Sequence, residues 1–283
     1  MAFVLKWANY VLNVSQRTHV MGILNVTPDS FSDGGRYLEL DKAVEHAIDM
    51  VLKGADIIDV GGESTRPYAN EVSGNEEMDR VIPVIEALRK ETSVPISIDT
   101  YKGEVAREAL KSGASMINDI SALRFDADMA AIAAEAGVPV ILMHMRGRPG
   151  NMQDKPLYED LILEILSFLK DAVGRALNAG VREDLIIVDP GIGFGKAFDD
   201  NLQIIKELSQ LALLGRPVLL GLSNKGFIGH VLGKEIHERG MGNMAATACG
   251  VMNGAHIVRA HDVKNAAETV KMVDAIIRGS VEK

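Results

Sequence analysis

The stretch MGILNVTPDSFSDGG, residues 21–35, begins as a buried strand and ends as a polar loop. Its start continues the apolar run from Val20, as in strands that are covered on both faces. Pro28 cannot continue a hydrogen-bonded ladder, and Asp, Ser and Gly dominate the positions that follow. The strand therefore delivers the amide of Asn25 to a polar, glycine-rich loop. This arrangement predicts a ligand-handling segment, with an ordinary solvated turn as the alternative.

One unit recurs from residue 19 onward: a short apolar strand, a polar loop, and a helix with a 3.6-residue apolar stripe. The expected strands are 20–26, 56–60, 95–99, 116–120, 138–144, 185–189, 218–222 and 256–259. Such a series of strand–helix units over about 250 residues is typical of a (β/α)8 TIM barrel. An open, doubly wound sheet is the competing fold. We expect residues 1–18 to form a short N-terminal β-hairpin that caps the barrel, and residues 19–283 to form one barrel domain.

Composition limits the class of protein. The chain has 283 residues, 47% of them hydrophobic, and a formal net charge of −9 without a basic cluster, which disfavours nucleic acid as a partner. The N-terminus lacks the pattern of a signal peptide, and no run approaches the ~18 apolar residues of a membrane span. We therefore expect a cytoplasmic protein without a membrane partner. The single cysteine, Cys249, is expected to be a small core residue.

Polar side chains lie at or just past the C-terminal end of every expected strand. They are Asn25, Gly61-Gly62-Glu63, Asp99, Asn118-Asp119, His144, Asp189, Lys225 and the pair Arg259 and His261. In a TIM barrel these positions converge on the face that carries the active site. An open sheet would instead concentrate its chemistry at one switch point. The pattern therefore favours the barrel.

Two groups of these residues predict binding chemistry. Asp99 and Asp189 end apolar strands, and with Asn118 they offer directional acceptors and donors suited to a flat polar heterocycle. Capping of the following helices is the alternative for either carboxylate. Arg259, His261 and Asn25 come from the last and first strands, which become neighbours when a barrel closes. They predict an anion site, with an Asn25 oxygen suited to Mg²⁺ on a phosphate; a structural role is the alternative for His261 alone.

The chain resembles the dihydropteroate synthase family over nearly its whole length. The matching segments, in family order, are MGILNVTPDSFSDGG (21–35), DIIDVGGESTRP (56–67), ISIDTYK (96–102), INDIS (117–121), ILMH (141–144), IIVDPGIGFGK (186–196), GLSNKGFIG (221–229) and VRAHDV (258–263). The resemblance implies a transferase of folate biosynthesis. Its reaction joins 6-hydroxymethyl-7,8-dihydropterin pyrophosphate to p-aminobenzoate, with release of pyrophosphate. It also implies dependence on Mg²⁺, sulfonamide sensitivity and a homodimer.

The resemblance also implies roles for individual residues. Asp99, Asn118, Asp189 and Lys225 would bind the pterin, and Asn25, Arg259 and His261 would bind the pyrophosphate, with the metal at Asn25. Thr65, Arg66, Pro67, Phe31, Phe194 and Gly226 would frame p-aminobenzoate. The residues implied to act in catalysis are Lys225, Asp99, Asp189, Arg259 and His261. On the opening loop, Asp29 and Asp33 would help to close the site and exclude water.

Two segments depart from the family pattern. The chain has Ser223-Asn224-Lys225-Gly226 where the family usually has Ser-Arg-Lys-Ser, and Gly242-Asn243 where it usually has Gly-Thr. The lysine is retained, but an arginine and a hydroxyl near the second substrate are lost. We therefore expect weakened arylamine affinity and altered sulfonamide sensitivity. Two other functions stay open, a pterin-binding paralogue without synthase activity and a methyltetrahydrofolate-dependent methyltransferase, although the latter has no need for the anion site.

Overall fold

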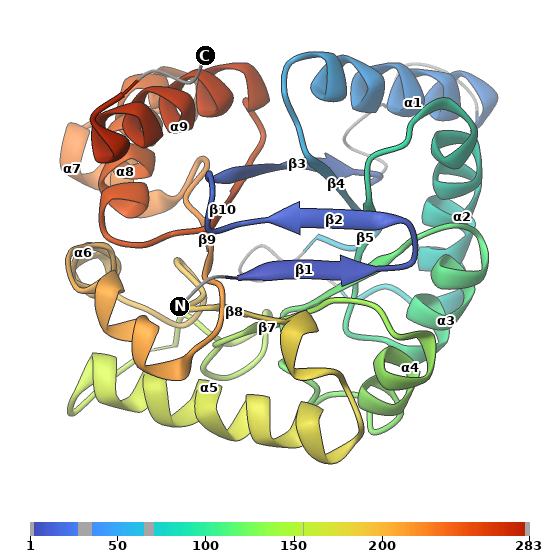
Figure 1. Cartoon of the computed structure of the whole chain (residues 1–283), viewed down its shortest axis with the longest axis horizontal. Coiled ribbons are helices and arrows are strands. Elements are labelled where there is room, and N and C mark those ends of the chain that lie inside the picture. Colours follow the sequence, from blue (N-terminus) through green and yellow to red (C-terminus); the bar gives the residue numbers. More distant parts are fainter. Residues whose placement is uncertain (1–2, 28–35, 65–70, 155, 281–283) are drawn as a thin grey trace.

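The computed structural model describes residues 3–27, 36–64, 71–154 and 156–280. It shows a (β/α)8 barrel with an antiparallel hairpin at its N-terminus, which confirms the expected fold class (Figure 1). The hairpin consists of β1 (Val4–Trp7) and β2 (Tyr10–Asn13). The division into a hairpin and one barrel domain at residue 18 stays a prediction.

Eight parallel strands form the barrel wall. They are β3 (His19–Asn25), β4 (Ile57–Gly61), β5 (Ile96–Asp99), β6 (Met116–Asp119), β7 (Val140–Met143), β8 (Ile186–Asp189), β9 (Leu219–Gly221) and β10 (Ile257–Ala260). From β3 to β8 each strand pairs with the next along the chain, and β10 pairs with both β3 and β9. The circle is completed by a single parallel bridge between Val188 and Val218. The short expected strands are thus confirmed, with ends that differ by a few residues.

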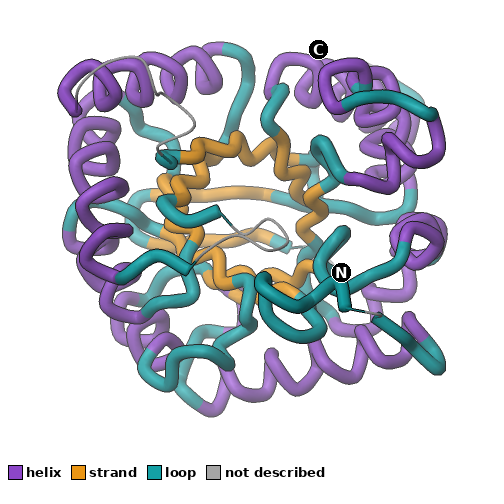
Figure 2. Tube along the Cα trace, turned by 180° about the vertical axis from the view of Figure 1, so that it is seen from behind, coloured by secondary structure: helices purple, strands orange, loops and turns teal. Residues whose placement is uncertain are grey.

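Helices cover the outside of the wall, because each parallel strand needs a crossover to reach its neighbour (Figure 2). They are α1 (Arg36–Leu52), α2 (Gly74–Glu91), α3 (Gly103–Lys111), α4 (Met129–Ala136), α5 (Leu161–Asn178), α6 (Phe198–Lys206), α7 (Gly226–Leu232), α8 (Gly240–Met252) and α9 (Val263–Arg278). Short 3₁₀ turns, η2 (Glu183–Leu185), η3 (Leu208–Leu214) and η4 (Ile236–Glu238), complete the connections. Ser73 and Asp160 cap α2 and α5 by accepting the N–H groups of Glu76 and Leu163.

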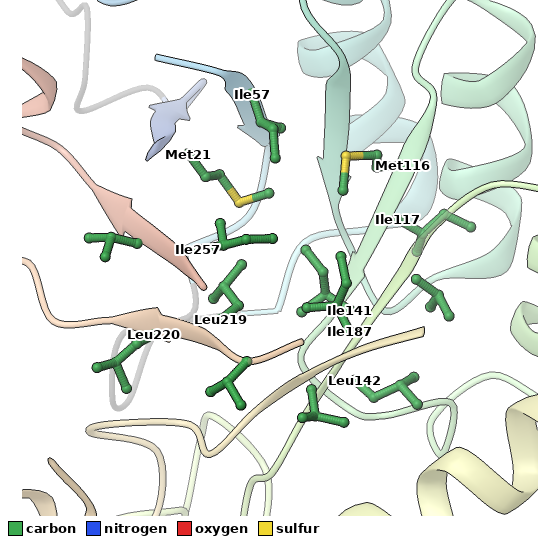
Figure 3. Close-up of a cluster of buried hydrophobic side chains, with 14 of the residues drawn as sticks. Met21, Ile57, Met116, Ile117, Ile141, Leu142, Ile187, Leu219, Leu220 and Ile257 are labelled. Carbon is green, nitrogen blue, oxygen red and sulfur yellow. The ribbon is translucent and has the colours of Figure 1, made fainter. Parts of the chain in front are cut away.

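The core fills the barrel and the layer between its strands and helices. Inside the barrel, apolar side chains from neighbouring strands converge (Figure 3). The fully buried ones include Met21, Ile57, Met116, Ile141, Ile187, Leu219 and Ile257. At the N-terminal end, the hairpin lies across the ring of strands (Figure 1) and buries Leu5 and Trp7. The open end of the barrel, where polar side chains can meet a ligand, is therefore the opposite, C-terminal end.

Cys249 was expected in the core, but it is exposed on α8. The prediction was wrong because small neighbours in sequence do not determine which face of a helix a residue occupies: Gly250, one position later, is the buried one. Among the described residues, no helix combines the length and apolarity needed to cross a lipid bilayer.

Candidate functional site

A buried ionic network lies at the C-terminal end of the barrel. Arg259, near the end of β10, donates through Nε to Oδ2 of Asp59 and through Nη2 to Oδ2 of Asp99, both over 2.6 Å. Asn118 of β6 donates to the same Oδ2 of Asp59 over 2.9 Å. The network therefore joins four strands through side chains that all point into the barrel.

Strand register brings these side chains together. Gly61, Asp99 and Asn118 lie side by side on β4, β5 and β6. Since side chains alternate along a strand, Asp59 faces the same way as position 61. A Cβ at Gly61 would lie 3.5 Å from Cβ of Asp99, so the missing side chain leaves room beside this carboxylate. The apolar strands thus set the position of each polar group.

Burial changes the proton affinity of these groups. Burial raises the pKa of Asp99 to about 7, although the Arg259 guanidinium opposes the rise. Burial lowers the pKa of Arg259, but Asp59 and Asp99 outweigh this and hold it above its ordinary value. Arg259 therefore stays charged. The aspartates that face it provide a negatively charged wall that can accept hydrogen bonds.

A third carboxylate, at the end of β8, and a lysine, at the end of the loop between β9 and α7, face this network. Oδ1 of Asp189 accepts the N–H of Gly191 over 2.7 Å, and burial raises the pKa of Asp189 to about 6. Lys225 places its Nζ 4.3 Å from the centre of the Phe194 ring. Burial and the nearby Arg259 lower the pKa of Lys225 to about 8, against the pull of Asp189 and Asp99. Both groups thus titrate near neutral pH.

The glycine-rich segment after β8, residues 191–196, is anchored by hydrogen bonds from Lys196 and Tyr158. Lys196 is 2% exposed, and its Nζ lies 2.9 Å from Nδ1 of His144 and donates to the carbonyl of Phe194 over 3.0 Å. Tyr158 donates from its hydroxyl to the carbonyl of Gly195 over 2.6 Å. Burial lowers the pKa of Lys196 to about 7, although the carboxylates of Asp189 and Asp200 oppose this shift. These contacts fix the backbone that presents Phe194.

The predicted anion side brings β3 and β10 together. Nε2 of His261 lies 3.5 Å from Nδ2 of Asn25. Nδ1 of the same ring lies 3.0 Å from Oγ of Ser223, which also accepts the His261 N–H over 3.3 Å. His261 is exposed and Asn25 half-buried, so this edge of the site is open to a ligand.

Some expectations from the sequence need amendment. Asp59 and Ser223 were not singled out as site residues, yet both contact predicted ones. Asp119 turns away and accepts the N–H groups of Ser121 and Leu123 over 2.7 Å each, so it caps a loop. His144 lies buried beside Lys196 and packs edge-on against Phe168, 4.7 Å between ring centres, rather than at the mouth.

Six predicted residues lie outside the described part of the chain: Phe31, Asp29, Asp33, Thr65, Arg66 and Pro67. The backbone just before residues 65–70 is firmly held. Glu63 accepts hydrogen bonds from the Tyr101 hydroxyl, over 2.7 Å, and from Lys102. Lys102 also binds Glu77 over 2.5 Å, and Arg80 donates to the carbonyl of Gly62 over 2.6 Å.

Gly226 is the first residue of α7 and is exposed. A Cβ there would meet Cε1 of Phe198 at 3.5 Å, an ordinary van der Waals contact. The described residues contain no group of three or more His, Cys, Asp or Glu side chains that could hold a metal ion. Mg²⁺ is usually held by one or two protein oxygens together with substrate phosphates and water, and the side-chain oxygen of Asn25 fits such a ligand set.

Comparisons with known proteins agree with this geometry. Residues 21–261 match the family described as pterin binding enzyme. The dihydropteroate synthase of Bacillus subtilis is 53% identical, covering 94% of this chain and 91% of its own. The structure of the Yersinia pestis dihydropteroate synthase with a sulfonamide drug has a TM-score of 0.92 at 44% identity, covering 98% of this chain and 100% of that one.

A further similar solved structure also contains a bound ligand. Dihydropteroate synthase from Xanthomonas albilineans in complex with 7,8-dihydropteroate has a TM-score of 0.88 at 41% identity, covering 97% of this chain and 98% of that one. The matched region of the pterin-binding family contains every polar residue of the barrel mouth described above. The chain therefore belongs to the pterin-binding enzymes and, within them, to the dihydropteroate synthase family.

Proposed function

We propose that the mouth of this barrel joins 6-hydroxymethyl-7,8-dihydropterin pyrophosphate to p-aminobenzoate. The aniline nitrogen attacks the pterin methylene carbon, the C–O bond to pyrophosphate breaks, and the bonding pair leaves with the pyrophosphate. The nitrogen then loses one proton to water. The observation that carries this proposal is the network of Asp59, Asp99, Asn118 and Arg259 beside Asp189 and Lys225.

The carboxylates and the amide are assigned to the pterin. Asp99 and Asp189 in their ionised forms accept hydrogen bonds from the amino and ring N–H groups of the heterocycle, and Asn118 can donate or accept. Lys225 donates to an acceptor on the ring. The same carboxylates stabilise the positive charge that develops on the methylene as the C–O bond breaks. Because burial raises the pKa of both aspartates, they take up protons readily when the pH falls.

The leaving group is assigned to the open edge of the site. His261 and Asn25 face the anion, with Ser223 orienting the His261 ring and Arg259 adding positive charge. Mg²⁺ would be held by Asn25 together with oxygens of the pyrophosphate, and it would neutralise part of the charge that accumulates there.

The arylamine is assigned to the surface that Phe194 and Gly226 present above the pterin. Thr65, Arg66, Pro67 and Phe31 would complete this subsite from segments outside the described residues. We also propose sensitivity to sulfonamides, which imitate the arylamine. The support is the sulfonamide drug bound to the Yersinia pestis relative. Because Gly226 has no hydroxyl, binding of both p-aminobenzoate and sulfonamides should be weaker.

The decisive test is release of pyrophosphate from the pterin substrate, measured with and without p-aminobenzoate and Mg²⁺. The proposal expects release that requires the arylamine and falls on removal of Mg²⁺ with a chelator. No release at all would favour the pterin-binding paralogue. A methyltransferase would instead demethylate methyltetrahydrofolate. The similarity to dihydropteroate synthases over more than nine tenths of the chain favours the synthase.

We propose a homodimer formed through α6, α7 and α8, which lie next to one another (Figure 1). Large apolar side chains are exposed there: Phe198, Leu202, Val231, Leu232, Ile236, Met241 and Met252. Exposed apolar patches of this kind are typical of protein interfaces. Met241→Asp should convert a dimer to a monomer in sedimentation experiments, whereas Met272→Asp on α9 should not. A cytoplasmic location and the lack of a nucleic-acid partner stay predictions.

A further inference from the structure

Two asparagines lock the loop before α7 to the first turn of α8. The backbone N–H of Asn224 donates to Oδ1 of Asn243 over 3.1 Å. In return, Nδ2 of Asn243 donates to Oδ1 of Asn224, also over 3.1 Å. Asn243 is 5% exposed, so both hydrogen bonds are shielded from water. The side chain of Asn224 therefore points toward α8.

The backbone of Asn224 needs this support. Its φ is +60°, in the left-handed region that asparagine tolerates better than most residues. Its carbonyl also accepts a hydrogen bond from Nη1 of Arg239 over 3.4 Å. The residue is thus held at its N–H, its carbonyl and its side chain, by two residues at the start of α8.

The support itself is rigid. A Cβ on Gly242 would lie 2.6 Å from side-chain atoms of Ile228 and Leu232, so α8 packs against α7 with no space between them. Asn243 follows directly, which fixes its amide relative to α7. The side-chain oxygen of Asn243 accepts the Asn224 N–H and its side-chain nitrogen donates to the Asn224 side chain, so one amide makes both contacts.

The residues on either side of Asn224 belong to the site. Ser223 contacts His261, and Lys225 lies over Phe194 toward Asp189. Three successive side chains therefore point to the anion edge, to α8 and to the pterin pocket. Any change in the backbone dihedral angles of Asn224 would therefore change the positions of Ser223 and Lys225 relative to each other.

We propose that Asn243 is a positioning residue that acts through Asn224 to place Lys225 against the pterin and Ser223 against His261. The proposal rests on the function proposed above for its effect on the substrate. Asn243 touches no reacting atom; it fixes the loop before the substrate arrives. Without it, the loop must be ordered during binding, and binding weakens by the free energy of that ordering.

The test is Asn243→Ala, with Asn253→Ala as the matched control. Asn253 ends the same helix and donates to the carbonyl of Ile205 over 2.8 Å, away from the loop. Asn243→Ala should raise KM for the pterin pyrophosphate about tenfold, because an unheld loop must be fixed on binding. Asn253→Ala should lower Tm but leave both KM values unchanged. Equal KM values in the wild type and Asn243→Ala would overturn the proposal.

Two further measurements keep the test decisive. In a double-mutant cycle, Asn224→Ala added to Asn243→Ala should cause little further rise in KM, since both remove the same contact; additive effects would contradict the coupling. Should Asn243→Ala not fold, Asn243→Thr retains one of the two hydrogen bonds and should show an intermediate KM.

Hydrogen exchange separates this proposal from the proposed function. Asn243→Ala should speed amide exchange in residues 223–225 about tenfold or more, as expected for a local opening that has become easier, and Asn253→Ala should not. Exchange is measured without turnover. A wild type that lacks synthase activity would therefore refute the function, while unchanged exchange would refute the positioning role.

Discussion

Asp59 is the residue on which the pterin side of the site depends. Its side chain is fully buried, and its Oδ2 accepts from both Arg259 and Asn118. One carboxylate oxygen thus orients a guanidinium and an amide from strands on either side of β4. A buried charge is tolerated only when it is paired, so the network holds together as a unit.

Asp59→Asn should therefore disturb binding as well as stability. The neutral amide cannot accept from both donors as strongly, and Arg259 would rely on Asp99 alone. We expect a loss of about 2–3 kcal/mol in the free energy of unfolding, below the roughly 3–5 kcal/mol for a buried charge left without any partner. KM for the pterin pyrophosphate should rise at least about tenfold. This is the loss expected when one hydrogen bond between a charged group and the substrate is weakened.

Asp56→Asn is the matched control for that variant. Asp56 precedes β4 at the other end of the barrel, where it pairs with Arg17 and accepts the Val20 N–H over 2.9 Å. Its replacement should lower Tm and leave KM unchanged. A similar KM for wild type and Asp59→Asn, measured in initial-rate assays, would show that the network is only structural.

The titrating groups of the site predict a bell-shaped pH profile for kcat/KM of the pterin substrate. Asp99 and Asp189, with pKa values of about 7 and about 6, take up protons as the pH falls and then cannot accept hydrogen bonds as carboxylates. Lys225, with a pKa of about 8, loses its charge as the pH rises. The optimum should lie between the pKa values of Asp99 and Lys225.

Lys225→Arg is the control variant for that pH profile. Arginine stays charged throughout this range, so the alkaline fall should move beyond pH 9 or disappear while the acid side is retained, as a flat guanidinium titrates only above a pKa of ~12. The measurement is kcat/KM from acid to alkaline pH at saturating p-aminobenzoate. A wild-type profile that does not change near neutral pH would contradict these assignments.

The residues at strand ends could be predicted because a carboxylate in an apolar strand is unusual. This signal identified Asp99 and Asp189. Asp59 carries the same signal, but it lies two residues before the end of its strand, and only the barrel's inward alternation shows that it reaches the mouth. Ser223 had no signal of its own, because its role depends on His261, which is distant in sequence.

At the scale of elements, the strands were predictable and the loops were not. Apolar runs with a helix after each define β3 to β10 almost completely. The orientation of a loop side chain depends instead on tertiary partners. Asn224 illustrates this: its position beside Lys225 suggested a place at the arylamine subsite, but its side chain binds Asn243 on α8.

That orientation predicts different effects for restoring the two family residues, Ser at position 226 and Arg at position 224. Gly226→Ser adds a side chain where a Cβ has an ordinary contact with Phe198, so it should fold normally. The new hydroxyl should lower KM for p-aminobenzoate roughly threefold to tenfold, the value of one added hydrogen bond of about 1 kcal/mol.

Asn224→Arg alone should not give this gain. It leaves the buried Asn243 amide without its side-chain partner, so KM for the pterin should rise; Asn243→Thr in the same chain should relieve the penalty. Initial-rate kinetics with both substrates varied distinguish the two effects. A lower KM for p-aminobenzoate in Asn224→Arg alone would contradict this prediction. It would mean that residue 224 can turn away from Asn243 on α8 without loss.

At the scale of the whole molecule, the two ends of the barrel have separate tasks. The C-terminal end gathers the ionisable groups of the site, while the N-terminal end is closed by β1 and β2 (Figures 1 and 2). In TIM barrels, residues at the N-terminal face serve stability and those at the C-terminal face serve function. The site residues predicted at the C-terminal strand ends anticipated the position of the site, whereas the polar groups at the N-terminal end, such as Asp56 with Arg17, form structural ion pairs.

The hairpin therefore allows stability to be changed without changing catalysis. Trp7 is 3% exposed and packs on Tyr10, 5.1 Å between ring centres, beneath the ring of strands. Trp7→Ala should cost about 3–5 kcal/mol in the free energy of unfolding, as for other large aromatic side chains removed from a core. Val11→Ala, at a position that is 62% exposed on the same hairpin, should cost less than about 0.5 kcal/mol. Below the Tm of each variant, KM for both substrates and kcat should match the wild type, because neither side chain reaches the mouth. A rise in KM for Trp7→Ala, measured where the variant is fully folded by circular dichroism, would show that the hairpin controls the site through the barrel interior.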